Sequence, residues 1–262
     1  MSYFDQQIAW VTGASSGIGE ALAKSLAKQG ATVILSARRE AELQRVAQEI
    51  GSNAHVLPLD LTDPEGMAQK AQQVQAAHGR IDVLINNGGI SQRSLTAETP
   101  LSVDRRIMEV NYFGQVALTK AVLPYMLEQG KGQIAVITSL TGKFGFPLRS
   151  AYAASKHALH GFFESLALET YDQGLRVTLV NPGRIRTDIS LHAITKDGSK
   201  HGEMDPGQAK GMTAEDCASV ILNALRKQKP EIQVGKVDTI MVYFKRYAPW
   251  LFRRIARKVS AK

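Results

Sequence analysis

The sequence has a single cysteine, Cys217, among its 262 residues. One thiol excludes an internal disulfide and offers no paired spacing for a metal, and the six histidines are scattered, so no metal site is predicted. Long apolar runs are also missing: no uninterrupted stretch approaches the roughly 18 residues that cross a bilayer. The first residues, Met1 to Asp5, lack the basic and apolar regions of a secretory signal. We therefore expect a cytoplasmic protein, peripheral at the inner face of a membrane if it contacts one.

Acidic residues are absent from the last part of the chain, from Thr239 to its end, where seven basic residues occur. Removing those seven from the 32 basic residues of the chain leaves 25 against 24 acidic ones, so the net charge of +8 belongs almost entirely to this tail. The body is neutral, which argues against a nucleic-acid partner. The seven residues are Lys245, Arg246, Arg253, Arg254, Arg257, Lys258 and Lys262.

Short apolar runs alternate with longer helical patterns along the chain. This order predicts parallel strands joined by right-handed helical crossovers, and the near-continuous apolar character of the strands indicates helices on both faces of the sheet. We expect a single Rossmann-type, doubly wound α/β domain with a seven-stranded parallel sheet. The expected strands are 8–12, 32–37, 55–59, 82–86, 133–138, 176–181 and 231–234, and the expected helices are 18–29, 40–50, 64–78, 102–128, 151–172 and 214–227.

Two segments depart from this alternation. Residues 184–212 contain several glycines, a proline and scattered charges, and a loop of that length in a compact domain is typically a lid or a binding loop. We therefore assign residues 1–238 to a catalytic, dinucleotide-binding domain that includes this lid. Residues 239–262 form a basic amphipathic tail.

A glycine-rich turn follows the first expected strand, in the order Thr12-Gly-Ala-Ser-Ser-Gly-Ile-Gly19. Glycines between a strand and a helix allow a tight turn and the close approach of a pyrophosphate, which the free N–H groups and the dipole of the helix favour. The spacing G-x-x-x-G-x-G differs from the commoner dinucleotide fingerprint, but its placement favours phosphate binding over a merely structural turn. The residues expected to contact the nucleotide here are Gly13, Ser15, Ser16, Gly17, Ile18 and Gly19.

This turn resembles that of the short-chain dehydrogenase/reductase family, and the resemblance extends from about residue 7 to residue 235. Within the family, the segments Asn111-Tyr-Phe-Gly114 and Arg149-Ser-Ala-Tyr-Ala-Ala-Ser-Lys-His157 are most similar to the dehydrogenase/reductase member 7 group. The resemblance implies hydride transfer between a nicotinamide nucleotide and a carbonyl or alcohol. It also implies a homodimer or homotetramer.

The end of the second expected strand bears on the choice of nicotinamide nucleotide. An NAD-selective site places an acid there for the ribose 2′-hydroxyl, and that acid would repel the phosphate of NADP. Here Ala37 stands in that place and Arg38 and Arg39 follow it. Guanidinium groups bind phosphate through charge-assisted bonds, to which Ser15 or Ser16 could add a hydroxyl. NADP(H) is favoured, with the alternative that both arginines only cover the entrance of a helix.

Further nucleotide contacts are implied by the resemblance. Asp60 and Leu61 match the position that holds the adenine ring. Asn86-Asn-Gly-Gly89 resembles the family's N-N-A-G motif with Gly88 in place of the alanine, which removes a methyl group and adds backbone freedom. The segment that clasps the nicotinamide corresponds to Asn181-Pro-Gly183 and the residues after it. The contacts expected from these segments are Asp60, Leu61, Asn87, Gly88, Gly89, Pro182, Gly183, Ile185 and Thr187.

Tyr152 and Lys156 are four residues apart on an expected helix, so their side chains share one face. A tyrosine pKa near 10 is too high for a base at neutral pH, and a neighbouring ammonium lowers it. The resemblance makes Ser139, at the carboxyl end of the fifth strand, the group that polarises the substrate oxygen. It makes Asn111 the residue that holds a water linking Lys156 to solvent. Asn111, Ser139, Tyr152 and Lys156 are thus the expected catalytic residues, with Tyr152 as acid/base.

The expected substrate pocket is mostly apolar, which favours a bulky lipophilic ketone, aldehyde or alcohol. The alternative is that some of these residues belong to the core. The residues are Phe144, Phe146, Leu148, Ile189 and Leu191, with Ile185 beside them and Gln92 and Arg184 as polar exceptions.

In the tail, Pro249 can start a helix with an apolar side and a basic side. Trp250 at its start fits an interfacial anchor on anionic lipid, and the helix fits equally well a position on the body or on a second subunit. The apolar side consists of Leu251, Phe252, Ile255 and Val259, and the basic side of Arg253, Arg254, Arg257 and Lys258.

Two other functions are compatible with the same fold. The first is an NAD-linked alcohol dehydrogenase, which would require Arg38 and Arg39 to ignore the ribose 2′ position. The second is a nucleotide-sensing interaction protein, since a fold alone does not determine function.

Overall fold

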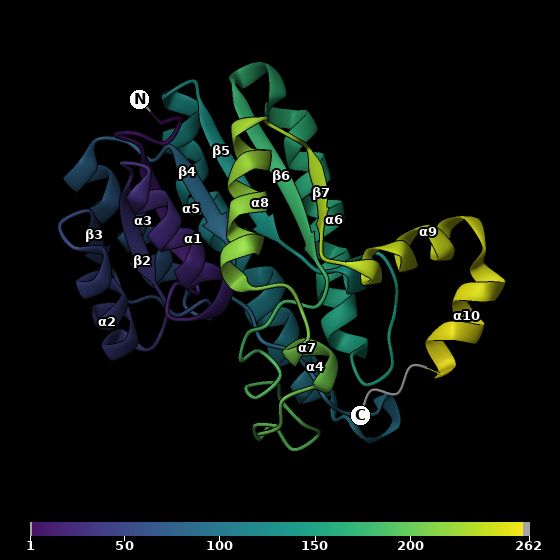
Figure 1. The fold of residues 1–262 in the computed structure, drawn as a ribbon. Coiled ribbons are helices and arrows are strands. Elements are labelled where there is room, and N and C mark those ends of the chain that lie inside the picture. Colours follow the sequence, from purple (N-terminus) through teal and green to yellow (C-terminus); the bar gives the residue numbers. More distant parts are fainter. Residues whose placement is uncertain (1, 259–262) are drawn as a thin grey trace.

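The computed structural model describes residues 2–258 and shows a parallel seven-stranded sheet between two layers of helices (Figure 1). The strand order is β3-β2-β1-β4-β5-β6-β7 and every neighbouring pair is parallel, which confirms the predicted fold class. The strands are β1 (Ile8–Thr12), β2 (Thr32–Ser36), β3 (Ala54–Val56), β4 (Val83–Asn86), β5 (Gly132–Ile137), β6 (Leu175–Pro182) and β7 (Glu231–Val234).

The order of strands reverses between β1 and β4, so the crossovers on either side of this point run in opposite directions. In an open α/β sheet, a crevice forms outside the carboxyl ends of the strands at such a point. The glycine-rich turn follows β1, Asn87 to Gly89 follow β4, and Ser139 follows β5. The topology therefore brings the main sequence motifs to one edge of the sheet.

Each face of the sheet is covered by its own apolar cluster. Helices α1 (Gly17–Lys28), α2 (Glu40–Ile50) and α8 (Ala214–Arg226) pack on one face, where α1 and α8 contact each other. The other face is covered by α3 (Pro64–His78), α5 (Gly114–Glu128) and α6 (Ser150–Thr170). Strand side chains that point alternately to the two clusters, such as Val11 and Trp10, are fully buried.

The long helix expected over 102–128 contains a π-helical turn. Helix α4 (Leu101–Met108) leads into η2 (Glu109–Phe113), which is π-helical, and then into α5. A π-turn holds one more residue than an α-turn and occurs often at functional sites. The turn contains Asn111, whose side chain is buried.

The expected lid is largely irregular, as predicted, and contains one short helix, α7 (Pro206–Ala209). An isolated bridge between Gln92 and Ile194 holds it to the body, and another between Ile185 and Met212 joins its two ends. Within residues 2–258, no helix is long and apolar enough to cross a membrane.

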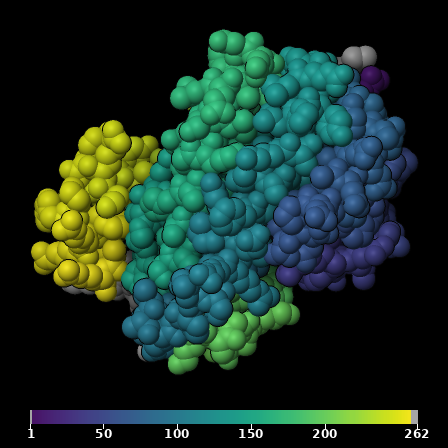
Figure 2. Space-filling model, turned by 180° about the vertical axis from the view of Figure 1, so that it is seen from behind, coloured from purple at the N-terminus to yellow at the C-terminus, as the bar shows by residue number. Residues whose placement is uncertain are grey.

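The tail forms a pair of helices, and one of them was not predicted from the sequence. After a 3-10 turn, η5 (Val237–Thr239), the chain forms α9 (Ile240–Tyr247) and then α10 (Pro249–Lys258), which begins at the predicted proline. The two helices form a hairpin that extends from the side of the domain (Figures 1 and 2).

The apolar side of α10 packs on the body of the protein. The Phe252 ring lies 5.1 Å from the Phe144 ring, centroid to centroid, and Ala256 is buried in the same cluster. The sequence left open whether this helix binds lipid, the body of the protein or a second subunit. For Phe252, packing on the body is observed. Val259 and Lys262 lie outside the described residues.

Candidate active site

The glycine-rich turn is too tight for side chains. Gly13 and Gly17 have φ values of +65° and +58°, in the left-handed region that favours glycine. A Cβ on Gly19 would lie 2.2 Å from the carbonyl oxygen of Gly13. Ser16 occupies the N-cap of α1, but its side chain caps no N–H group. The first N–H groups of α1 are therefore available to an anion, and the turn fits the pyrophosphate of a dinucleotide.

The segment after β4 supports this turn from below. The Thr12 hydroxyl accepts hydrogen bonds from the N–H groups of Asn87 (2.9 Å) and Gly88 (3.0 Å), and Asn87 Nδ2 donates to the Thr12 carbonyl at 2.9 Å. A Cβ on Gly88 would lie 2.7 Å from Leu61 Cδ1. The Leu61 side chain thus fills the space that the methyl group of the family's alanine would occupy, and the motif stays packed.

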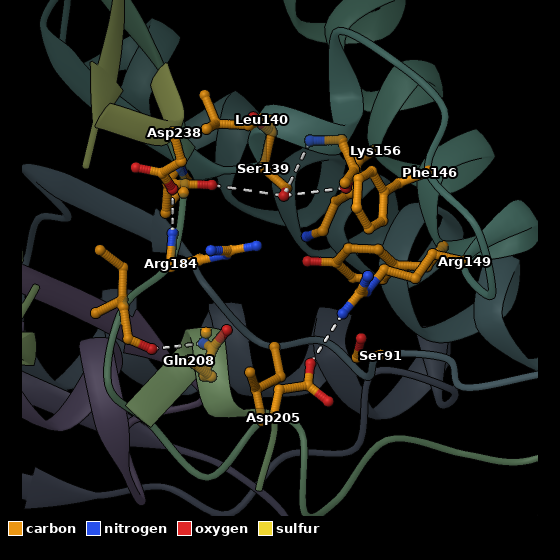
Figure 3. Close-up of a pocket in the computed structure, with 18 of the residues that line it drawn as sticks. Ser91, Ser139, Leu140, Phe146, Arg149, Lys156, Arg184, Asp205, Gln208 and Asp238 are labelled. Carbon is orange, nitrogen blue, oxygen red and sulfur yellow. Dashed lines mark hydrogen bonds and ion pairs between the residues drawn. The ribbon is translucent and has the colours of Figure 1, made fainter. Parts of the chain in front are cut away.

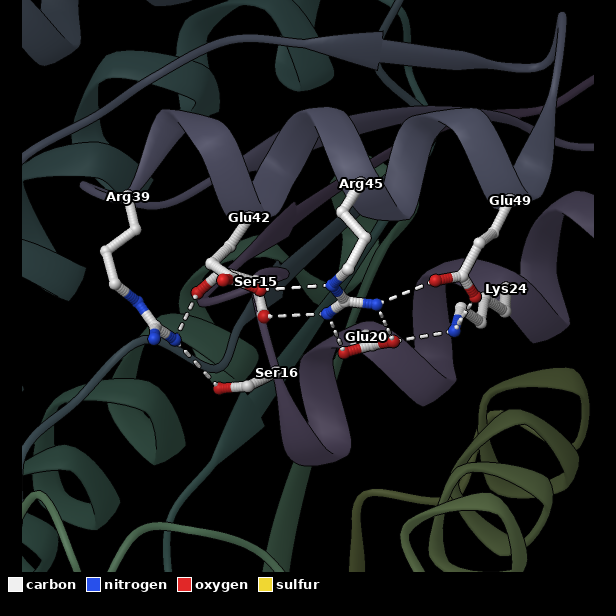
Figure 4. Close-up of polar contacts among 8 residues, drawn as sticks. All are labelled: Ser15, Ser16, Glu20, Lys24, Arg39, Glu42, Arg45 and Glu49. Atoms are coloured by element: carbon white, nitrogen blue, oxygen red, sulfur yellow. Dashed lines mark hydrogen bonds and ion pairs between the residues drawn. The ribbon is translucent and has the colours of Figure 1, made fainter.

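Arg39 points back to the glycine-rich turn (Figure 4). Its guanidinium donates to the hydroxyls of Ser15 (3.2 Å) and Ser16 (3.4 Å), and no ion pair of Arg39 occurs within residues 2–258. Arg45, in contrast, is held by three carboxylates, from Glu20, Glu42 and Glu49. Arg39 therefore keeps a positive charge beside the glycine-rich turn, while Arg45 ties α1 to α2 and donates a hydrogen bond to the Ser15 carbonyl at 3.5 Å.

A cavity of about 490 Å³ joins these features. It is lined by Thr187 from the nicotinamide segment and by all the contacts expected from the other segments except Gly19: Gly13, Ser15, Ser16, Gly17, Ile18, Arg38, Arg39, Asp60, Leu61, Asn87, Gly88 and Gly89. Ala37, which follows the last residue of β2, also lines it and carries no carboxylate.

A second cavity, of about 530 Å³, adjoins the first and holds three of the four expected catalytic residues (Figure 3). Ser139, Tyr152 and Lys156 all line it, and Ile18, Asn87, Gly89 and Thr187 belong to both cavities. Ser139 caps the short helix after β5: its Oγ accepts hydrogen bonds from the Thr141 N–H (3.2 Å) and the Thr141 hydroxyl (3.0 Å). The remaining walls include Pro182, Gly183 and Ile185.

Lys156 is buried, and burial lowers its pKa from 10.5 to about 7. Its ammonium donates a hydrogen bond to the Ile137 carbonyl at 2.8 Å. Burial also raises the pKa of Tyr152, while the Ser139 hydroxyl and the charges of Arg149 and Arg93 act in the opposite direction. The cations that lower the tyrosine pKa in the protein itself are thus two arginines rather than the lysine expected from the sequence.

Asn111 is held rigidly in the π-turn. Its side chain accepts from the Ile90 N–H at 2.8 Å and donates to the Ile90 carbonyl at 2.9 Å and to Ser155 Oγ at 3.1 Å. A Cβ on Gly89 would lie 3.1 Å from Asn111 Oδ1 and 3.7 Å from Lys156 Nζ. Asn111 and Lys156 therefore flank Gly89, and of the two only Lys156 lines the second cavity.

An ion cluster that sequence reasoning missed lies opposite Ser139. Arg93 and Arg149 both bind the carboxylate of Asp205, and Figure 3 shows the contact of Arg149, at 2.9 Å. All three residues line the cavity, and the side chain of Arg93 is almost fully buried. Asp205 lies in the lid, so the cluster fastens the lid beside Tyr152. No motif spacing indicates it, because its members come from three distant segments.

The predicted substrate-pocket residues divide into two groups. Phe144, Phe146, Arg184 and Ile189 line the cavity, together with Ile185. The prediction for Gln92 is wrong, because this side chain is fully buried and its Oε1 accepts the N–H groups of Ala151 (2.9 Å) and Tyr152 (3.3 Å). Gln92 thus caps the start of α6.

Leu148 and Leu191 were also predicted wrongly, because neither lines the cavity. Leu148 has a φ of +64°, and its backbone carbonyl accepts a hydrogen bond from the Ser94 N–H. The backbone carbonyl of Leu191 accepts one from the Gly202 N–H inside the lid. The structure adds Ile240 and Met241 from the tail as lining residues, together with Val237 and Asp238 just before it. These residues are a mixture of apolar and charged types, so the sequence gave no indication that they line a cavity.

Comparison with known proteins gives consistent matches. The family model described as short chain dehydrogenase matches residues 7–197. The chain is 42% identical over 273 residues to the Anopheles gambiae dehydrogenase/reductase SDR family protein 7-like, covering 99% of this chain and 86% of that protein. The solved structure of a short-chain dehydrogenase from Streptomyces avermitilis is 32% identical, with a TM-score of 0.82 over 97% of this chain and 100% of that one.

Two further solved structures of similar fold carry a nicotinamide nucleotide. A short chain dehydrogenase/reductase from Burkholderia phymatum, in complex with NAD, has a TM-score of 0.83 at 22% identity, covering 96% of both chains. An alcohol dehydrogenase from Thermococcus sibiricus, complexed with 5-hydroxy-NADP, has a TM-score of 0.77 at 26% identity, covering 89% of this chain and 97% of that one. Neighbours of this fold therefore bind either nucleotide.

Proposed function

Because the chain belongs to the short-chain dehydrogenase family and is an oxidoreductase, we propose that it transfers a hydride between NADP(H) and a carbonyl or secondary alcohol, with Tyr152 as acid/base. One observation carries this proposal. Ser139, Tyr152 and Lys156 line a single cavity, and that cavity shares walls with the one built on the glycine-rich turn. A dinucleotide with its pyrophosphate at α1 can therefore extend its nicotinamide toward these three residues.

Bound NADPH would supply the hydride to the carbonyl carbon. The protein's own residues handle the oxygen: the Ser139 hydroxyl donates a hydrogen bond to it, and the Tyr152 hydroxyl donates the proton that makes it an alcohol. Within residues 2–258, the Lys156 ammonium donates to one acceptor, the Ile137 carbonyl, so two of its three donors can bind ribose hydroxyls. A lysine with a pKa of about 7 exchanges its proton near neutrality, which suits a role in reprotonating Tyr152.

The preference for NADP(H) over NAD(H) rests on Ala37, Arg38 and Arg39. Ala37 offers no carboxylate to a ribose 2′-hydroxyl, and the Arg39 guanidinium is held toward the turn by two serine hydroxyls. A guanidinium in that position favours a 2′-phosphate.

The substrate that fits the cavity is a lipophilic ketone or aldehyde. Apolar side chains form much of its wall, including Leu140, Phe144, Phe146, Ile189 and Met241. A volume of about 530 Å³ is in the range of small-molecule sites.

Large apolar side chains are exposed on the helices opposite α1 and α8, at Leu101, Phe113 and Leu168. Contiguous exposed apolar patches mark subunit interfaces, and we propose that these residues belong to one. We include a homodimer or homotetramer in the proposal, and light scattering of the purified protein tests it.

The deciding experiment is a fluorescence titration with NADPH and NADH, followed by turnover with a panel of lipophilic ketones. We expect NADPH to bind at least about tenfold more tightly than NADH, because its 2′-phosphate makes a charge-assisted contact.

Tyr152→Phe should bind NADPH normally and lose turnover, while Tyr171→Phe, on the surface, serves as the matched control. Equal or tighter NADH binding would favour the NAD-linked dehydrogenase. NADPH binding without turnover on any ketone would favour the nucleotide-sensing protein.

A further inference from the structure

The inner side of the hairpin of α9 and α10 already packs on the body of the protein. Phe252 and Ala256 of α10 are buried against Leu140 and Phe144, and Met241 and Phe244 of α9 pack against the same cluster. The apolar side of α10 is therefore not free for another partner. Whatever the hairpin binds must meet its outer surface.

The outer surface carries an apolar and aromatic stripe along α9. Ile240, Tyr243 and Tyr247 are three, four and seven residues apart, so they lie on one side of the helix. Their exposed fractions are 45%, 55% and 76%, and Trp250, just past the turn between the helices, is 68% exposed. Aromatic side chains that are exposed together mark an interaction surface rather than scattered surface residues.

The hairpin that carries the stripe is strongly basic. Lys245 and Arg246 are exposed on α9, and Arg253, Arg254 and Arg257 are exposed on α10. No acidic residue occurs from Thr239 to the end of the chain. Two copies of such a surface would repel each other, so the charge favours an anionic partner over a second copy of this chain.

The stripe also begins at the rim of the catalytic cavity. Ile240 is exposed and at the same time lines that cavity, beside Val237, which is 81% exposed, and Met241. A surface bound to the stripe would therefore lie at the opening of the cavity. Figures 1 and 2 show the hairpin as a lobe projecting from the domain, where a flat surface can reach it.

We propose that the outer surface of the α9–α10 hairpin docks on an anionic lipid bilayer and places the mouth of the catalytic cavity against it. Tyrosine and tryptophan side chains occupy the headgroup level of a bilayer, and basic residues add an attraction to anionic lipid. The docking stands on the hairpin alone, whereas its purpose, the entry of a lipophilic substrate directly from the bilayer, rests on the proposed function.

The two tryptophans allow a direct test. Trp10 is fully buried in the sheet and Trp250 is exposed on the hairpin. We expect vesicles of phosphatidylglycerol with brominated acyl chains to quench Trp250, and equivalent phosphatidylcholine vesicles to have little effect. Raising the salt concentration should reverse the binding, because the attraction is screened. No quenching on phosphatidylglycerol, or equal quenching on both lipids, would overturn the proposal.

Matched variants separate the hairpin from the rest of the surface. Tyr243→Ser/Tyr247→Ser and Arg253→Glu/Arg254→Glu should each weaken vesicle binding roughly tenfold or more. The controls Tyr171→Ser and Lys227→Glu/Lys229→Glu change exposed residues at the amino edge of the sheet and should bind as the wild type does. Circular dichroism verifies that each variant is folded. Equal weakening by the controls refutes a specific surface.

Two additional measurements distinguish the remaining outcomes. If light scattering shows that Tyr243→Ser/Tyr247→Ser reduces the mass of the wild-type assembly, the stripe contacts a second copy and the proposal is wrong. Turnover of a water-miscible ketone should be unchanged in both hairpin variants. If no ketone is turned over but vesicles are bound, the proposed function fails and the docking surface stands.

Discussion

Replacing Lys156 by methionine should abolish turnover and at the same time stabilise the fold. The wild-type ammonium is buried, and the burial lowers its pKa from 10.5 to about 7. At about 1.4 kcal/mol per pKa unit, this depression corresponds to a destabilisation of about 5 kcal/mol at low pH. Methionine keeps the aliphatic chain but leaves the Ile137 carbonyl without its donor, which costs about 1–2 kcal/mol. The net gain near pH 7.5 should be about 3 kcal/mol.

The sign of the pH dependence follows from the same pKa values. Between pH 7 and 10.5 the unfolded lysine is protonated and the folded one is increasingly neutral, so the unfolded state binds more protons. Wild-type stability therefore rises with pH in this window, by about 1.4 kcal/mol per unit relative to Lys156→Met. The advantage of the variant should shrink from about 3 kcal/mol at pH 7.5 to near zero at pH 9.5.

The measurement is urea denaturation of the nucleotide-free protein, followed by circular dichroism at pH 7.5, 8.5 and 9.5. Nucleotide must be absent, because binding to the folded state would stabilise the wild type by mass action. Lys227→Met, at the exposed end of α8, is the matched control and should parallel the wild type at every pH. A Lys156→Met variant that is no more stable than the wild type, or whose advantage is independent of pH, would refute the reasoning.

Three further predictions concern single side chains. Asp205→Asn leaves two arginines facing each other without their carboxylate, so it should lower the free energy of unfolding by about 2–3 kcal/mol and increase proteolysis within the lid. Asp197→Asn in the same loop is the control. Equal cleavage of both variants would contradict the role of the cluster. Gly19→Ala should reduce NADPH affinity by at least about tenfold in the same titration, because its Cβ would lie 2.2 Å from a backbone oxygen in the turn; unchanged affinity would show that the turn can open. Cys217, whose pKa burial raises to about 12, should react with a thiol reagent at pH 8 only after denaturation, and fast labelling of the native protein would show that α8 opens.

The framework of the fold was predictable because the strands are buried on both faces. Such strands appear as continuous apolar runs, and their alternation with amphipathic helices leaves one architecture. The expected strand over 55–59 is observed as Ala54–Val56, although the N–H groups of Leu57 and Leu59 still donate to the carbonyls of Leu35 and Ala37. Helix α9 was missed because it is only 8 residues long and no side chain caps its start.

The site was predictable where it depends on local order along the chain. The turn after β1 and the pair Tyr152 and Lys156 are set by spacing within one element. The cluster of Arg93, Arg149 and Asp205 depends on which distant loops meet, and a single sequence holds no pattern for that. Burial of Lys156 was equally hidden, because the sequence shows a cation and the fold determines its solvation.

The π-turn at Glu109–Phe113 has a consequence for the length of the chain. Its extra residue rotates everything before it by about 100° relative to an uninterrupted α-helix. With that rotation, Val103 and Ile107 of α4 lie buried against the start of α6. Deleting one residue from the turn would give the helix better internal hydrogen bonds and would swing both apolar side chains into solvent. At this point the number of residues is under as strong a constraint as their identity.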